Sequence, residues 1–252
     1  CHKRLNNTNE SIKYAMAAIA VNNDYKEAIE FVADMVGPKN SERWLYFAYC
    51  TKNQDVLFVR ENYEANADYY NNIYSTDDPS RYKGLYERVA ELSAKIENPY
   101  TKLSEMNEPM TICDIGCGSA ELSKYVKNYE GFDFSEKAIE FAKTKTPNVK
   151  VINLYEYDYS RRKIYTVLEV LEHIDDLKLL DLISSGNFVI ASVPSFADRG
   201  HLRRYTERII KERFKDLIDI KFFERFNWNN GVWIRGGKPT NSHITLFGGI
   251  KK

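Results

Sequence analysis

The sequence has no excess of charge of either sign. Its 252 residues include 36 lysines and arginines and 36 aspartates and glutamates, so the formal net charge at pH 7 is zero. Proteins that bind nucleic acid or anionic membranes through a long-range field carry an excess of basic residues. We therefore expect neither nucleic acid nor a membrane among its partners.

Long apolar runs and cysteine clusters are also missing. No run approaches the roughly 20 apolar residues of a membrane-spanning helix, and no signal peptide is visible. Of the four cysteines, only Cys113 and Cys117 are close in sequence, and Cys113 lies in an apolar, strand-like run. This spacing fits neither a zinc knuckle nor a disulfide framework, so we expect reduced thiols and a cytoplasmic location.

The first part of the chain differs in pattern from the rest. Residues 1–65 have helical patterns, such as the alanine-rich Ser11–Val21, and faintly resemble a single tetratricopeptide unit. Stacked repeats need about three units, so we interpret this part as a helical cap or linker before a domain at 66–252. The chain starts at Cys1 without a methionine, which indicates a processed product or, preferably, a domain of a longer polypeptide.

From Met110 onward, strands alternate with amphipathic helices. Strand-like runs lie at 110–115, 129–134, 149–154, 164–170 and 187–194. Helical patterns lie at 119–127, 135–145 and 175–184, after an earlier one at about 82–96. Strands separated by single helices predict right-handed βαβ units and a parallel sheet. Two further runs, at 217–226 and 243–250, have only a Gly- and Asn-rich connection, which predicts an antiparallel pair at the end of the sheet.

The first of these strands leads directly into Gly116-Cys117-Gly118. Glycine permits a tight turn and close approach of a ligand, and a helix starting there offers free N–H groups to a carboxylate or phosphate. Glu121 stands where the dinucleotide-binding fingerprint has its third glycine. A carboxylate would face a pyrophosphate badly, which argues against NAD and FAD.

An acidic residue ends the second strand, in Gly131-Phe132-Asp133-Phe134-Ser135. A carboxylate at this place can accept hydrogen bonds from both hydroxyls of a ribose. Asp133 could instead cap the helix that follows, but Ser135 can do that itself. We therefore interpret Asp133 as a ribose-binding residue.

Three motifs in this order resemble those of class I S-adenosylmethionine-dependent methyltransferases. They are Asp114-Ile-Gly-Cys-Gly-Ser-Ala, Gly131-Phe-Asp-Phe-Ser and Glu169-Val-Leu-Glu-His-Ile-Asp-Asp176. The resemblance covers about residues 66–252. It implies an α/β, Rossmann-like sheet of seven strands with the last strand antiparallel, and S-adenosyl-L-methionine as the cofactor.

By position, the resemblance also implies residue roles. Asp114, Gly116 and Gly118 would hold the methionine part, Asp133 the ribose and Phe134 the adenine, while Glu169 would line the methyl-donor pocket. The family often has an acidic residue just past the third strand, where this chain has Leu154. Because this chain lacks that acidic residue, adenine would be recognised by backbone groups near Leu154 and Tyr155, or by Glu156 or Asp158. Tyr74, with Tyr69, Tyr70 and Arg81, could form a flap over the carboxylate of the cofactor, although helix packing explains the tyrosines as well.

Two histidines follow strands on the expected ligand side. His173 comes after the fourth strand and His201 after the fifth, and a histidine with a pKa near 6.5 suits general-base catalysis. His173 could instead bond its own loop, and His201 could order a lid. Arg203 and Arg204 could anchor an acceptor or be solvated surface residues.

The adjacent acids Asp175 and Asp176 could suggest a metal site. They stand at the predicted start of a helix, where carboxylates cap the chain and complement the helix dipole. We therefore expect helix capping there and no metal.

The Tyr-rich segment 69–74, followed later by Gly200-His-Leu-Arg-Arg-Tyr205, resembles methyltransferase domains beside glycosyltransferases, among them C-terminal domains of large glycan-building proteins of giant algal viruses. It implies O-methylation of a sugar hydroxyl of a glycan by one domain of a longer polypeptide, in the host cytoplasm if the protein is viral. One alternative is O- or N-methylation of a small molecule, such as a quinone precursor or an amine. Another is a non-catalytic module that binds the cofactor.

Overall fold

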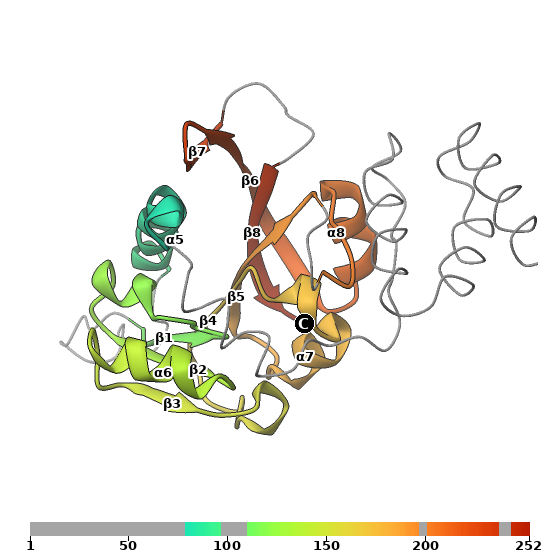
Figure 1. The fold of residues 1–252 in the computed structure, drawn as a ribbon. Helices are drawn as coiled ribbons and strands as arrows, with labels where there is room; N and C mark the ends of the chain where they lie inside the picture. Colours follow the sequence, from blue (N-terminus) through green and yellow to red (C-terminus); the bar gives the residue numbers. More distant parts are fainter. Residues whose placement is uncertain (1–78, 97–109, 197–200, 237–242) are drawn as a thin grey trace, which may run out of the picture.

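The computed structural model describes residues 79–96, 110–196, 201–236 and 243–252 (Figure 1). The predicted helical cap at 1–65 lies outside these residues, and so do Tyr69, Tyr70 and Tyr74. Its separation from a domain at 66–252 therefore stays a prediction. Among the described residues, no helix has the length and apolar character that crossing a bilayer requires.

An eight-stranded sheet with the order β3-β2-β1-β4-β5-β8-β6-β7 forms the centre of the fold (Figure 1). Its strands are β1 (Ile112–Ile115), β2 (Tyr129–Asp133), β3 (Val149–Val151), β4 (Ile164–Leu168), β5 (Phe188–Pro194), β6 (Ile218–Asn229), β7 (Val232–Arg235) and β8 (His243–Lys251). Strands β1 to β5 pair in parallel, whereas the last strand, β8, runs antiparallel to β5 and β6. The predicted Rossmann-like sheet with an antiparallel last strand is confirmed.

Helices cover both faces of this sheet. They are α5 (Lys83–Ala94), α6 (Glu136–Lys143), α7 (Asp176–Leu182) and α8 (Glu207–Phe214), with short 3₁₀ helices η2 (Pro79–Tyr82), η4 (Glu121–Lys124), η5 (Leu154–Glu156) and η6 (Leu171–His173). Because side chains alternate along a strand, Ile115 packs in the apolar cluster of α7 and α8. Ile112 packs on the opposite face, with α5 and α6.

The structure differs from the sequence expectations in three elements. The helix expected at 119–127 is only the four-residue η4, which starts after Ala120 in a left-handed conformation (φ 56°). Helix α8 was not expected. Strand β7 pairs with β6 inside the connection that we interpreted as a turn, so the sheet has eight strands rather than seven.

The extra strand helps to hold α5 over the sheet. The guanidinium of Arg88 in α5 donates two hydrogen bonds to Glu224 of β6, of 2.8 Å from Nε and 2.5 Å from Nη2. Arg235 of β7 pairs with the same carboxylate at 2.9 Å. Both Arg88 and Glu224 are largely buried, so this two-point contact fixes how α5 lies on the sheet.

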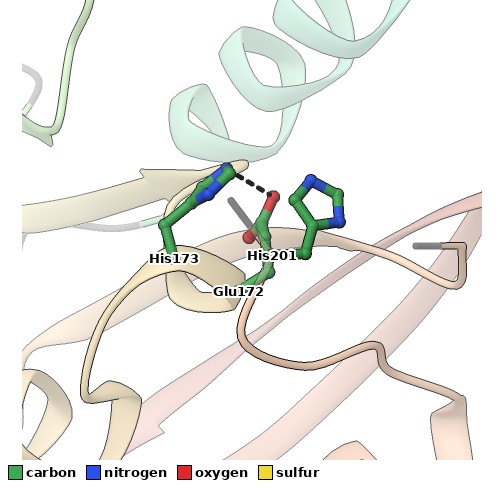
Figure 2. Close-up of side chains that lie close together, drawn as sticks. All are labelled: Glu172, His173 and His201. Carbon is green, nitrogen blue, oxygen red and sulfur yellow. Dashed lines mark ion pairs between the residues drawn. The ribbon is translucent and has the colours of Figure 1, made fainter. Parts of the chain in front are cut away.

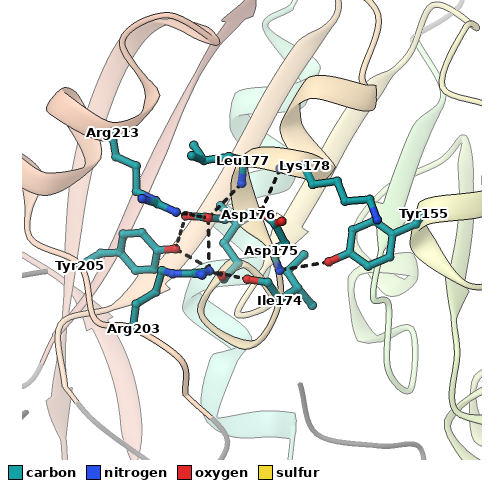
Figure 3. Close-up of polar contacts among 10 residues, drawn as sticks. Tyr155, Ile174, Asp175, Asp176, Leu177, Lys178, Arg203, Tyr205 and Arg213 are labelled. Carbon is teal, nitrogen blue, oxygen red and sulfur yellow. Dashed lines mark hydrogen bonds and ion pairs between the residues drawn. The ribbon is translucent and has the colours of Figure 1, made fainter. Parts of the chain in front are cut away.

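A buried ionic network joins α7 to the segment after β5 (Figure 3). The carboxylate of Asp176 accepts hydrogen bonds of 2.6 Å from Arg213 Nε and from the Tyr205 hydroxyl, and it lies 3.2 Å from Arg203 Nη1. Arg203 Nη1 also donates to the carbonyl oxygens of Leu171 and Ile174. Asp175 instead caps α7, by accepting from the backbone N–H of Lys178. Capping is therefore confirmed for Asp175, and Asp176 is occupied by arginines.

We predict that Asp176→Ala lowers the free energy of unfolding by about 3–5 kcal/mol, because it leaves buried arginines without a counter-charge. Asp175→Ala is the matched control, and it should cost only about 1 kcal/mol through loss of the helix cap. Urea titrations followed by circular dichroism measure both values. Equal losses in the two variants would contradict the role assigned to the buried network.

Candidate functional site

The turn after β1 is folded against the end of β2. Gly116 and Gly118 have φ of +66° and +51°, a region that side chains rarely adopt. The Gly118 N–H donates to Asp133 Oδ2 at 3.0 Å, and the Cys117 N–H donates to the carbonyl oxygen of Phe132 at 3.0 Å. A Cβ at position 116 would lie 2.7 Å from Val170 Cγ2. The sequence thus makes a bare, tightly packed backbone turn at the carboxyl end of the sheet.

Asp133 links this turn to the helix that follows β2. Besides the contact with Gly118, its Oδ1 accepts from the Ser135 N–H at 2.9 Å. Ser135 itself caps α6, because its hydroxyl oxygen accepts from the Ala138 N–H at 3.1 Å. Each carboxylate oxygen has two lone-pair directions, so an oxygen that accepts a backbone N–H can also accept from a hydroxyl. The side chain therefore has the position and the chemistry to receive a diol.

Asp114 is buried beneath the turn, where its own sheet neighbours hold it. Its oxygens accept from the Thr166 hydroxyl at 2.7 Å and from the Tyr129 hydroxyl at 2.9 Å. Burial raises the pKa of Asp114 to about 6, against the effect of these two donors, and the nearby Asp133 raises it further. Asp114 thus fixes the end of β1 and adds negative charge below the glycine turn.

Helix α5 and η2 bring further groups to the same end of the sheet. Burial raises the pKa of the Tyr86 hydroxyl, and the charges of Asp114, Glu121 and Glu169 add to this effect because they lie close to it. Arg81 is near enough to Glu169 to favour its ionised form. Of the expected flap, the structure thus describes Arg81 and places it near the donor-pocket candidate.

Glu169 has a strained backbone directly after β4. Its φ is +55°, which is uncommon outside glycine and is frequent at functional sites. Ser192 of β5 holds it there, because its carbonyl oxygen accepts from the Glu169 N–H at 3.1 Å and its hydroxyl donates to Glu169 Oε1 at 2.8 Å. Burial raises the pKa of Glu169 to about 7. The Glu169 carboxyl group thus lies against Ser192 of β5, at the carboxyl end of β4.

The candidates for adenine lie around the ends of β2 and β3. Phe134, directly after β2, is 37% exposed. The Tyr155 hydroxyl accepts from the Asp175 N–H at 3.0 Å, and Lys178 Nζ lies 4.3 Å from the centre of its ring, so this side chain holds the start of α7 (Figure 3). The carbonyl oxygen of Leu154 accepts from the Tyr159 hydroxyl, while Glu156 and Asp158 are exposed.

The two candidate bases meet at one buried carboxylate (Figure 2). The centres of the His173 and His201 rings are 4.8 Å apart, and His173 Nε2 lies 3.7 Å from Glu172 Oε1. Burial lowers the pKa of His201 to about 4, so its ring is neutral at pH 7. Burial also raises the pKa of Glu172 well above its ordinary value, and the neighbouring Glu169 adds to this effect. The predicted pair of histidines is thus brought together, with a carboxyl group that we had not considered.

For Arg203 and Arg204, the interpretation as solvated surface residues is wrong. Both are buried rather than solvated. Arg203 Nη1 is engaged by Asp176 and by carbonyl oxygens of the η6 segment, so it anchors the protein chain rather than an acceptor. Of the cysteines that the structure describes, Cys113 and Cys117 are free thiols, as expected.

Sequence reasoning missed Glu172 and Tyr86. Glu172 lies inside the motif Glu169–Asp176, but its burial depends on the segment after β5, which the motif does not specify. Tyr86 lies next to the apolar face of α5. The signal for a site residue was its hydroxyl group, because a buried tyrosine hydroxyl usually has a polar partner.

No protein-family model matches this sequence, and no curated protein matches it either. Among solved structures, it resembles the N-methyltransferase NodS from Bradyrhizobium japonicum WM9 in complex with S-adenosyl-L-homocysteine, with 13% identity and a TM-score of 0.49 over 74% of this chain and 99% of that one. It also resembles magnesium protoporphyrin IX methyltransferase from Synechocystis PCC 6803, with 15% identity and a TM-score of 0.46 over 77% and 98% of the two chains. Likenesses at this level do not assign an activity.

We predict that Gly116→Ala lowers the free energy of unfolding by about 1–2 kcal/mol from the left-handed conformation alone, with a steric cost from Val170 in addition. In a double-mutant cycle with Val170→Ala, measured by urea unfolding, the glycine substitution should cost less in the Val170→Ala background. The same cost in both backgrounds would show that the turn does not pack against Val170 as described.

Proposed function

We propose that this chain is a methyltransferase that uses S-adenosyl-L-methionine. The observation that carries the proposal is the contact of Asp133 with the glycine turn at the carboxyl ends of β1 and β2. In open α/β sheets, ligands bind beyond the carboxyl ends of the strands. A bare turn beside a diol-accepting carboxylate suits a nucleoside that carries an amino acid.

The surrounding residues fit such a cofactor. A Cβ at Gly116 would lie 2.7 Å from Val170 Cγ2, so glycine lets the turn pack this closely against the end of β4. The half-exposed Phe134 offers a ring to a purine base. Glu169 and Arg81 supply one carboxyl group and one positive charge, which suit the amino and carboxylate groups of a methionine part. The absence of a third glycine, with Glu121 paired to Lys145 at 2.5 Å instead, favours this ligand over a dinucleotide.

When bound, S-adenosyl-L-methionine supplies an electrophilic methyl group, so the protein has to orient the acceptor and assist the loss of its proton. Glu172, His173 and His201 lie beyond β4 and β5, on the side of the turn. Two imidazoles and a carboxyl group beside the donor pocket suit an acceptor that loses a proton, such as a hydroxyl. We therefore place the acceptor against this cluster.

We propose a sugar hydroxyl of a glycan as the acceptor, on the basis of the motif resemblance to methyltransferase domains that stand beside glycosyltransferases. In this proposal the chain works as one domain of a longer polypeptide. A panel of acceptors incubated with radiolabelled S-adenosyl-L-methionine tests it, with glycans expected to receive the label. Strict preference for a quinol or an amine would reject the glycan and support a small-molecule methyltransferase.

Isothermal titration calorimetry with S-adenosyl-L-homocysteine tests the cofactor. We expect Asp133→Ala to weaken binding by about 1–3 kcal/mol, because charge-assisted hydrogen bonds to the ribose are lost. Asp219→Ala removes an exposed carboxylate on β6 and should leave the affinity unchanged. If Asp133→Ala binds as tightly as the unaltered chain, the ribose assignment is wrong. If the unaltered chain does not bind S-adenosyl-L-homocysteine at millimolar concentration, the proposed cofactor is wrong.

A further inference from the structure

Glu172 presents both of its carboxylate oxygens to the protein interior without a hydrogen bond. The residue is fully buried, and within the described part of the chain neither oxygen has a hydrogen-bond partner. Buried polar atoms in proteins are almost always satisfied, and an unsatisfied one often marks an ion or water that completes the site. His173 Nε2 lies 3.7 Å from Glu172 Oε1, which is too long for a hydrogen bond, so a closer positive partner would stabilise this buried carboxyl group.

Two imidazole nitrogens face the same point. Ligand atoms of Glu172, His173 and His201 all lie within 4.8 Å of one another, and Figure 2 shows the carboxylate between the two rings. Ligands about 2.1 Å from a shared ion lie at most about 4.2 Å apart. Small side-chain rotations therefore bring the three groups onto one ion.

The contact made by His201 fixes the tautomer of its neutral ring. Its Nδ1 lies 3.3 Å from the carbonyl oxygen of Phe196, which can only accept, so Nδ1 carries the proton. Nε2 then keeps its lone pair. Histidines that bind metals usually donate their other ring N–H to a carbonyl or carboxylate in this way.

Hydrogen bonds fix the segments that carry these three residues without the help of an ion. The Leu202 N–H donates to the carbonyl oxygen of Glu172 at 2.6 Å, which ties the His201 segment to η6. Next to this contact, Arg203 and Tyr205 connect the same two segments through Leu171 and Asp176. The three candidate ligands thus come from segments that are locked together by other residues.

We propose that Glu172, His173 and His201 bind a divalent transition-metal ion, with Zn²⁺ as the best match. Two imidazoles with one carboxylate suit Zn²⁺ and Fe²⁺ better than Mg²⁺ or Ca²⁺, which prefer oxygen ligands alone. Three protein ligands leave a position open, as in catalytic zinc sites.

The open position gives the ion a chemical role, which rests on the proposed methyl transfer. An acceptor hydroxyl bound to the ion becomes more acidic and releases its proton to water. The oxygen then forms its bond to the methyl carbon as the carbon–sulfur bond breaks, and that electron pair stays on sulfur. The histidines hold the ion and are not themselves the base.

The test is titration of the metal-free chain with Co²⁺ as a visible-absorbing substitute for Zn²⁺, followed by displacement with Zn²⁺. We expect one site with d–d absorption, without the strong near-ultraviolet band that cysteine ligands add. Glu172→Gln keeps the size of the side chain and removes its charge, and we expect it to weaken binding at least tenfold. His173→Ala and His201→Ala should do the same. Circular dichroism confirms that each variant is folded.

Two control variants show where the ion binds. Glu212→Gln removes an exposed carboxylate of α8, and His2→Ala removes a possible ligand near the amino terminus. Both should bind Co²⁺ as the unaltered chain does. The proposal is overturned if the chain binds no Co²⁺ at submillimolar concentration, if Glu172→Gln binds as tightly, or if His2→Ala abolishes binding.

This titration contains neither S-adenosyl-L-methionine nor an acceptor. Metal binding by a chain that fails to bind S-adenosyl-L-homocysteine would therefore reject the methyl transfer and keep the metal site. Binding of S-adenosyl-L-homocysteine by a chain that fails to bind Co²⁺ would reject the metal site and keep the proposed cofactor.

Discussion

The site depends on the carboxylate of Asp133, which joins two pieces of backbone that the sheet alone does not connect. Through Gly118 it holds the turn after β1, and through Ser135 it holds the start of α6. The positive φ at Gly118 points its N–H at the carboxylate, and this conformation needs glycine. The proposed cofactor site therefore depends first on the backbone conformation of this turn, and the side chains around it come second.

A second constraint brings together residues that are far apart in sequence. Asp176 at the start of α7 attracts Arg203, Tyr205 and Arg213, which follow β5, and so fixes the chain after β5 against η6. His201 reaches the neighbourhood of Glu172 because of this network. The carboxyl ends of β4 and β5 then present one polar cluster beside the glycine turn, where a donor and an acceptor can meet.

Sequence reasoning could predict the parts of the fold that depend on short-range patterns. Alternating strands and helices placed β1 to β5, α6 and α7, and the glycine turn marked the ligand side of the sheet. It could not predict that η4 is so short, because Ala120 takes a left-handed conformation directly before it and the residue type does not mark this. Nor could it predict β7, whose pairing with β6 joins residues that resemble a turn. Burial of Arg203 and Glu172 depends on contacts between distant segments, which residue type alone does not reveal.

The central claim is that a nucleoside bearing an amino acid occupies the turn between β1 and β2. A crystal structure of the chain grown with S-adenosyl-L-homocysteine measures this most directly. The account predicts density for the amino-acid part along the backbone at Gly116–Gly118, with both ribose hydroxyls within hydrogen-bond distance of Asp133. A turn that is empty at saturating ligand, or a ligand bound elsewhere with Asp133 making only its two backbone contacts, would contradict it.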